Sequence, residues 1–327
     1  MHLQEESLRG WIPYQLFMEG NVPFVKWLYT GNKIFTEPFF EETIACCRSH
    51  PYNSSKFRGV SSLESMIEWS NSLPEISPVT FIFHISRCGS TLISQLIGLN
   101  KKYKVLSEVP FFDELLRLPF KLNGLDDGFH TKILQAAIKF VGQNRTGLEE
   151  HLFIKTDSWH ISFHKTIRQL YPDAPFILLY RSPDEVVYSH QKLRGMQAVP
   201  GLIEPEIFGL TASEINELAL DAYTALVLEN YLSVFEKVAV LDEQACLCNY
   251  NEGAMKIMDN LAKHLKINWG NDHIEKMKRR SGFHSKYPNQ NFTKDRKQDS
   301  VPGYLQNAMK AYHRLGEKQM LDKKQLF

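Results

Sequence analysis

One stretch of the chain, residues 80–98 with the sequence TFIFHISRCGSTLISQLIG, constrains the fold more than any other. It opens with a short apolar run, rich in β-branched and aromatic side chains, that has the length of a buried strand. Leucine and isoleucine then recur at helical spacing from Leu92 to Ile97. Between these two parts, Ser86 to Thr91 contains the glycine of a tight turn. The stretch therefore predicts a strand, a turn and a helix.

The turn has the features of an anion-binding site. A strand that breaks at Gly89 and re-enters a helix directs free backbone N–H groups and the positive end of the helix dipole at one point. Ser90 and Thr91 add hydroxyl donors, and Arg87 adds a cation. The ATP-binding pattern GxxxxGKS or GxxxxGKT is not met, because His84 occupies its first glycine position and Ser90 its lysine position. We expect this turn to bind phosphate or a similar anion.

Short apolar runs typical of buried strands recur along the chain and alternate with helical segments. They cover residues 103–108, 152–154, 175–180 and 246–250. This alternation predicts an α/β fold in which a central parallel sheet lies between helices on both faces. Ligands of such sheets bind outside the carboxyl ends of the strands. Charged residues occur at four of these ends: Arg87, Glu108, Lys155 and Arg181.

Residues 1–75 have a different pattern from the rest of the chain. Aromatic residues are scattered through them, and Pro13, Pro23, Pro38 and Pro51 interrupt every longer run. Prolines placed in this way favour short helices and turns that pack on a larger body. We therefore expect residues 1–75 to be an accessory segment and residues 76–327 to form the main domain.

The overall charge and hydropathy limit the classes of partner. The chain has 38 Lys+Arg against 37 Asp+Glu, a formal net charge of +1, so bulk attraction to nucleic acid or to an acidic membrane surface is not expected. The start MHLQEESLRGW lacks the pattern of a signal peptide, and no apolar stretch reaches membrane-spanning length. We expect a cytoplasmic protein.

The cysteines and histidines do not predict a metal site. None of the five cysteines forms a CxxC pair, and most lie in apolar surroundings, which fits reduced thiols and argues against zinc. His160 and His164 lie four residues apart, but no acid accompanies them as in the HExxH pattern. We predict that no metal is bound.

Two motifs resemble the signatures of the P-loop sulfotransferases, which use 3′-phosphoadenosine 5′-phosphosulfate (PAPS). FHISRCGSTLISQLI is similar to their 5′-phosphosulfate loop. LYPDAPFILLYRSPDEVVYSH is similar to their 3′-phosphate signature, in which a strand delivers an arginine, here Arg181, and a serine follows eight residues later, here Ser189. The resemblance covers roughly residues 80–300 and is closest to the tyrosylprotein sulfotransferase branch. It implies a P-loop NTPase-like three-layer sandwich.

The resemblance also implies roles for the residues at matching positions. In the tyrosylprotein branch an acid downstream of the loop arginine is the catalytic base, and a lysine after the next core strand stabilises the transferring sulfuryl group. Glu108 and Lys155 match these positions, and Arg87 would stabilise charge on the bridging oxygen. The small-molecule branch has a histidine base after Lys-Thr, where this chain has Asp157, so Asp157 is the alternative base.

The cofactor-binding residues follow from the same matches. The 5′ end of PAPS would be bound by Arg87, Cys88, Gly89, Ser90 and Thr91, and its 3′-phosphate by Arg181 and Ser189. The glycine-rich 3′-phosphate loop of the small-molecule branch is absent. A basic segment, residues 276–297, occurs in its place, and we expect Ser285 and Lys286 within it to substitute.

These matches predict an enzyme that transfers a sulfuryl group from PAPS to a hydroxyl group by in-line displacement, without a metal. The acceptor would be a small molecule or a peptide, and the fold does not specify which. A P-loop kinase is the alternative enzyme class, disfavoured because the loop lysine is missing. A third candidate function is that of a nucleotide-binding module without transfer activity.

Overall fold

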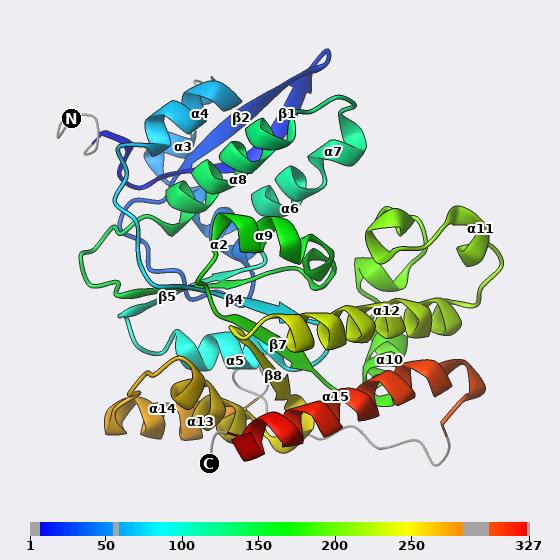
Figure 1. Cartoon of the computed structure of the whole chain (residues 1–327). Helices are drawn as coiled ribbons and strands as arrows, with labels where there is room; N and C mark the ends of the chain where they lie inside the picture. Colours follow the sequence, from blue (N-terminus) through cyan, green and yellow to red (C-terminus); the bar gives the residue numbers. More distant parts are fainter. Residues whose placement is uncertain (1–6, 55–58, 284–300, 326–327) are drawn as a thin grey trace. The chain divides into compact units, whose positions relative to one another are not determined.

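The computed structural model describes residues 7–54, 59–283 and 301–325 (Figure 1). Two compact units can be separated. The first comprises residues 1–80, 97–156 and 166–172, and the second comprises residues 81–96, 157–165 and 173–327. Ser285 and Lys286, predicted to bind the 3′-phosphate, lie outside the described residues.

The central element is a five-stranded sheet with the strand order β5-β6-β4-β7-β8. The pairs β4–β7, β5–β6 and β7–β8 are all parallel. The predicted α/β fold is therefore confirmed, and each strand begins within a residue or two of the expected position. Their bounds are β4 (Val79–His84), β5 (Tyr103–Ser107), β6 (His151–Lys155), β7 (Phe176–Tyr180) and β8 (Ala245–Asn249).

The strand order also explains why helices cover both faces of the sheet. The connection from β4 to β5 runs along the sheet in one direction, and the next three connections run in the other. Parallel crossovers are right-handed, so connections that run in opposite directions along a sheet place helices on opposite faces of it. These helices are α5 (Ser90–Ile97) in the first, α6 (Pro110–Leu116), α7 (Leu118–Lys121) and α8 (Asp127–Gly142) in the second, α9 (His164–Leu170) in the third, and α10 (Pro183–Lys192), α11 (Ala212–Ile215) and α12 (Leu220–Leu241) in the fourth.

The central strands form the core because they are apolar on both faces. Every residue of β6 and β7 is buried, as expected for parallel strands covered on both sides. In the second unit, Phe83 packs edge-on against Phe176 across the β4–β7 pair, with ring centroids 5.0 Å apart. The loops that follow these strands begin at the edge of this buried core.

The N-terminal residues form more regular structure than the sequence predicted. Besides short helices, they contain a three-stranded antiparallel sheet, where only helices and turns were expected. Pro13 lies inside a strand because a register shift between Pro13 and Gln15 accommodates it. The elements are β1 (Trp11–Glu19), β2 (Val22–Tyr29), β3 (Val60–Ser62), α2 (Phe40–Cys47), α3 (Pro51–Ser54) and α4 (Leu63–Ser70).

The chain after β8 is helical. Its α-helices are α13 (Ala254–His264), α14 (Asn271–Ser281) and α15 (Gln306–Gln325). In the second unit α15 packs along α12, and β8 contacts both α12 and α13 (Figure 1). Among the described residues, no helix combines the length and the apolar character needed to cross a bilayer.

Candidate active site

The predicted anion turn of the second unit has an unusual backbone. Ser86, Arg87 and Gly89 all have positive φ angles, of 67°, 48° and 78°. Two consecutive non-glycine residues in this region are uncommon and mark a strained turn. Residues with positive φ change the direction in which the N–H groups of the turn point, and α5 begins directly afterwards at Ser90. The first N–H groups of that helix have no acceptor within it, so the turn presents donors suited to an anion.

Only glycine fits at position 89. A Cβ atom there would lie 2.0 Å from Cε2 of Tyr250, and the positive φ adds backbone strain for any other residue. The Tyr250 ring therefore lies directly against the turn. Burial raises the pKa of its hydroxyl above the ordinary value.

Three side chains of the turn are buried and help to hold its shape. The Cys88 thiol is fully buried and donates to the Leu179 carbonyl on β7 at 3.4 Å. Ser90 and Thr91 are buried as well, and the Ser94 hydroxyl donates to both of their carbonyls. Cys88 thus anchors the turn to the sheet through its side chain.

Arg181 connects the end of β7 to the anion turn. Its Nη1 donates to the Arg87 carbonyl at 3.2 Å, and its Nε donates to Oε2 of Glu185 at 2.6 Å. The same Glu185 oxygen accepts from Asn251 at 2.9 Å, and Asn251 accepts from the Ser182 N–H at 3.0 Å. Glu185 is 4% exposed, so its charge depends on Arg181 for compensation. Among the described residues, Nη2 of Arg181 has no partner.

The side chains of two further predicted phosphate ligands, Arg87 and Ser189, are associated with α10. The Arg87 guanidinium donates to the Leu193 carbonyl at 2.5 Å, beyond the end of α10. Ser189 is half-buried on α10, and its hydroxyl has no partner in the described part of the chain. It lies four residues after Glu185, and therefore on the same face of the helix. No hydrogen bond joins Ser189 to Arg181 among the described residues.

A cavity of about 370 Å³ lies beside Arg181 in the second unit. Tyr250 gives it an aromatic wall, and Lys256 and Ser281 add a cation and a hydroxyl. Its volume is within the range of small-ligand pockets. The cavity thus combines an aromatic surface with two positively charged side chains, Arg181 and Lys256, and two carboxylates, those of Glu185 and Glu252.

The first unit contains the predicted catalytic pair. Nζ of Lys155 lies 2.7 Å from Oε1 of Glu108, and the Glu108 N–H donates to the Lys155 carbonyl at 2.8 Å. This double link forms because β5 and β6 are parallel neighbours in which Ser107 pairs with Lys155. Glu108 adopts a positive φ of 53°, which turns the chain from β5 toward α6. The predicted base and the predicted cation are therefore in direct contact.

Lys155 is unusually well enclosed. Its side chain is fully buried, and its Nζ lies 5.0 Å from the centre of the Phe39 ring. A buried ammonium is stable only when it is paired, and Glu108, 21% exposed, provides the opposite charge. The pair places a carboxylate at the protein surface and a cation beneath it.

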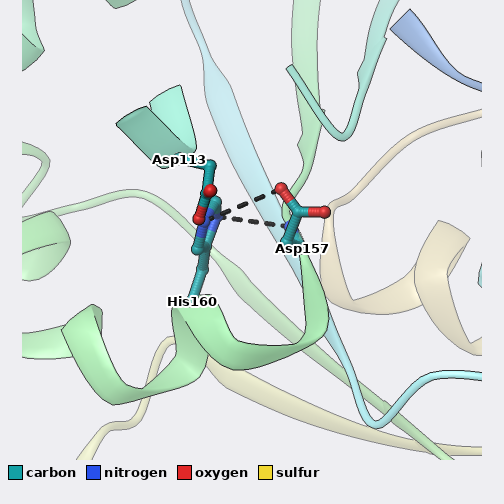
Figure 2. A group of neighbouring side chains, drawn as sticks. All are labelled: Asp113, Asp157 and His160. Carbon is teal, nitrogen blue, oxygen red and sulfur yellow. Dashed lines mark hydrogen bonds and ion pairs between the residues drawn. The ribbon is translucent and has the colours of Figure 1, made fainter. Parts of the chain in front are cut away.

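Asp157, the alternative base, has a local structural contact. It caps the 3₁₀ turn Ser158–Phe163, and its N–H donates to Nδ1 of His160 at 3.3 Å. Nε2 of His160 lies 3.7 Å from Oδ2 of Asp157, as Figure 2 shows. Asp113, also drawn there, belongs to the first unit and pairs with Arg117 at 3.0 Å. The capping geometry accounts for an acid at position 157.

The structure thus gathers the predicted residues into two groups. Arg181 and the turn 86–91 form one in the second unit, and Glu108 with Lys155 forms the other in the first. Sequence reasoning missed Glu185, Asn251, Tyr250 and Phe39. Tyr250 and Asn251 follow β8 directly, so the rule that located the other charged residues at strand ends points to them as well. Phe39 carries no such signal.

Comparisons with known proteins found matches only among solved structures. No protein-family model matches the chain, and no curated protein matches it. Sulfotransferase STF9 from Mycobacterium avium is 12% identical, with a TM-score of 0.45 over 81% of each chain. Sulfotransferase STF1 from Mycobacterium tuberculosis H37Rv is 10% identical, with a TM-score of 0.44 over 66% of this chain and 75% of that one. The sulfotransferase domain of the Synechococcus PCC 7002 olefin synthase is 14% identical, with a TM-score of 0.44 over 74% of this chain and 95% of that domain.

Proposed function

We propose that this protein is a sulfotransferase that uses PAPS and transfers its sulfuryl group to a hydroxyl acceptor. The observation that carries the proposal is the strained turn 86–91 with Arg181 bonded to its backbone, because it joins the two sequence signatures of PAPS binding in one network. The buried Glu108–Lys155 pair supports the transfer step.

The donor groups of the second unit fit a doubly phosphorylated nucleotide. The N–H groups of the turn and the hydroxyls of Ser90 and Thr91 suit the 5′-phosphosulfate. Arg181, with Nη2 available among the described residues, suits the 3′-phosphate, and Ser189 and the segment with Ser285 and Lys286 are proposed to add donors. The Tyr250 ring in the 370 Å³ cavity offers a surface on which a nucleobase can stack.

The first unit supplies the groups for the transfer. PAPS, when bound, supplies the sulfuryl group and keeps the electron pair of the broken sulfur–oxygen bond on its 5′-phosphate. Glu108 accepts the proton that the acceptor hydroxyl loses. Lys155 pairs with the Glu108 carboxylate, and its ammonium would place positive charge near the negative charge that develops during transfer. Arg87 would add positive charge at the turn. No metal is required for these roles.

Binding calorimetry with adenosine 3′,5′-bisphosphate, AMP and ATP–Mg²⁺ tests the proposal. We expect the bisphosphate to bind without metal and at least about tenfold more tightly than AMP, because a desolvated arginine on a phosphate contributes that much or more. ATP–Mg²⁺ should bind more weakly than the bisphosphate, since the turn lacks the lysine of nucleotide kinases. Tighter binding of ATP–Mg²⁺ than of the bisphosphate would contradict the proposal and favour the P-loop kinase alternative.

A further inference from the structure

A second cavity, of about 450 Å³, lies in the first unit. Residues from β1, α2 and the start of α6 line it, among them Tyr14, Ile44 and Pro110, which supply apolar surface. The volume is within the range of sites for small molecules. It is separate from the 370 Å³ cavity, with no lining residue in common.

This cavity is adjacent to the Glu108–Lys155 pair through two short connections. Pro110 lines the cavity two residues after Glu108, so their Cα atoms are at most about 7.6 Å apart. On the other side, the Phe39 ring lies against Lys155 Nζ, and Glu41 of the lining follows two residues later. Two short stretches of chain therefore join the cavity lining to the Glu108–Lys155 pair.

The lining carries an excess of negative charge. Glu41, Glu42 and Glu114 contribute three carboxylates against one guanidinium, that of Arg48. Among the described residues, none of the three carboxylates has a salt-bridge partner. Two of these acids, Glu41 and Glu42, lie in the first turn of α2, where they also favour the helix dipole.

Glu114 has no such dipole role. One of its carboxylate oxygens accepts the Leu16 N–H at 2.5 Å, and the other has no partner among the described residues. Burial raises the pKa of this carboxyl above its ordinary value. The charges of Lys26 and Lys121 lower this pKa, whereas the charge of Asp113 raises it. A cation placed in the cavity would compensate this half-buried carboxylate.

We propose that this cavity binds the acceptor and selects molecules that carry an ammonium or guanidinium group beside the hydroxyl that is sulfated. The assignment rests on the proposed function, because it takes Glu108 as the group that accepts the hydroxyl proton. The apolar side chains contact the body of the acceptor, and Glu114 with Glu41 and Glu42 pairs with its cation. An anionic acceptor is disfavoured by repulsion.

Three phenols of similar shape and different charge test this selection: tyramine, 4-ethylphenol and 3-(4-hydroxyphenyl)propanoate. Their affinities are measured by calorimetry on the full chain in the presence of adenosine 3′,5′-bisphosphate. We expect tyramine to bind about tenfold more tightly than 4-ethylphenol, as for one partly desolvated charge pair. The propanoate should bind most weakly, and the differences should shrink as ionic strength rises.

Matched variants locate the selection in the cavity. Glu114→Gln keeps an acceptor for the Leu16 N–H and should lower tyramine affinity about tenfold without changing that of 4-ethylphenol. Glu41→Gln with Glu42→Gln should have a smaller effect, about threefold, because both side chains are exposed. Glu68→Gln makes the same charge change on exposed α4, outside the cavity, and should change neither affinity.

Sulfuryl transfer from PAPS to the same phenols separates this inference from the function on which it rests. Transfer that follows the order of affinities supports both. The acceptor site is overturned if the three phenols bind with equal affinity, if tyramine does not bind, or if Glu114→Gln does not change tyramine affinity. In each of these cases, transfer to 4-ethylphenol would leave the sulfotransferase assignment intact. Selective tyramine binding with no transfer to any phenol overturns the acceptor assignment together with the proposed function.

Discussion

Two regions at the carboxyl ends of strands differ in the groups that carry their charge. In the second unit, the turn 86–91 presents backbone N–H groups, and the charge of Arg181 is already balanced by Glu185. In the first unit, two side chains of opposite charge, Glu108 and Lys155, face each other directly. Backbone donors keep their position and charge, which suits binding, whereas a carboxylate exchanges protons, which suits chemistry. The contrast predicts that binding and transfer are separable by mutation.

Backbone strain is concentrated at these same two regions. Five non-glycine residues of the described chain have positive φ, and three of them are Ser86, Arg87 and Glu108. Such conformations cost on the order of 1–3 kcal/mol each and persist where the surroundings enforce them. Their clustering at two strand ends favours a functional reason over an accident of loop geometry.

Replacing Glu108 should produce the largest effect on transfer. Glu108→Gln keeps the size and one hydrogen-bond acceptor but removes the base, so turnover should fall by about two to four orders of magnitude. The rate of adenosine 3′,5′-bisphosphate release from PAPS with an accepted hydroxyl measures this. A variant that loses less than tenfold would remove Glu108 from the role of base.

The control for this experiment addresses the lysine left behind. Glu108→Gln removes the carboxylate that pairs with the fully buried Lys155, which lowers stability. The double variant Glu108→Gln with Lys155→Met removes both charges and should unfold at a higher temperature than Glu108→Gln alone. Its turnover should remain as low, which shows that lost catalysis and lost stability have separate causes.

Arg181 and Arg87 should differ in which ligand they affect. Arg181→Ala should weaken adenosine 3′,5′-bisphosphate binding by roughly 2–5 kcal/mol, the cost of removing a desolvated charge partner. It should weaken AMP far less, although the loss of its bond to the Arg87 carbonyl loosens the turn for both ligands. Arg87→Ala should weaken both ligands similarly and also slow transfer. Calorimetry with the two nucleotides gives the comparison, and equal losses in the Arg181 variant would leave this arginine a purely structural role.

Much of this picture was predictable from the sequence. All five strands of the central sheet were located because each is a short apolar run that ends in a charged or polar residue. Glu108, Lys155, Arg87 and Arg181 were selected by their positions at strand ends. Contact between Glu108 and Lys155 was not predictable, because it depends on the order in which β5 and β6 pair.

Other features depend on tertiary contacts that no local pattern records. The strands of the N-terminal sheet were missed because Pro13 was read as a break, and only the paired strand shows that a bulge accommodates it. Glu185 was missed because it lies in the first turn of α10, where an acid commonly favours the helix dipole, yet in the structure it also pairs with Arg181. Tyr250 lies beside Gly89, which is far from it in sequence.

Asp157 should give the smallest effect. Asp157→Asn removes the charge but keeps a side chain that caps a helical turn about as well, so stability should change by less than about 1 kcal/mol. Turnover should stay within about threefold of the unaltered protein, since the contacts of Asp157 account for its presence without a role as base. Thermal unfolding and the release assay check both values. If turnover instead falls by about two orders of magnitude, Asp157 is the base.

The separation of binding from transfer is tested most directly by the affinity of two variants for adenosine 3′,5′-bisphosphate, measured by calorimetry. Glu108→Gln alters the first unit and should bind within about threefold of the unaltered protein, since its side chain takes no part in nucleotide binding. Gly89→Ala introduces a Cβ atom 2.0 Å from the Tyr250 ring and strains a residue at φ 78°, so it should bind at least about tenfold more weakly while the chain stays folded. Loss of affinity in Glu108→Gln, with affinity kept in Gly89→Ala, would contradict the account.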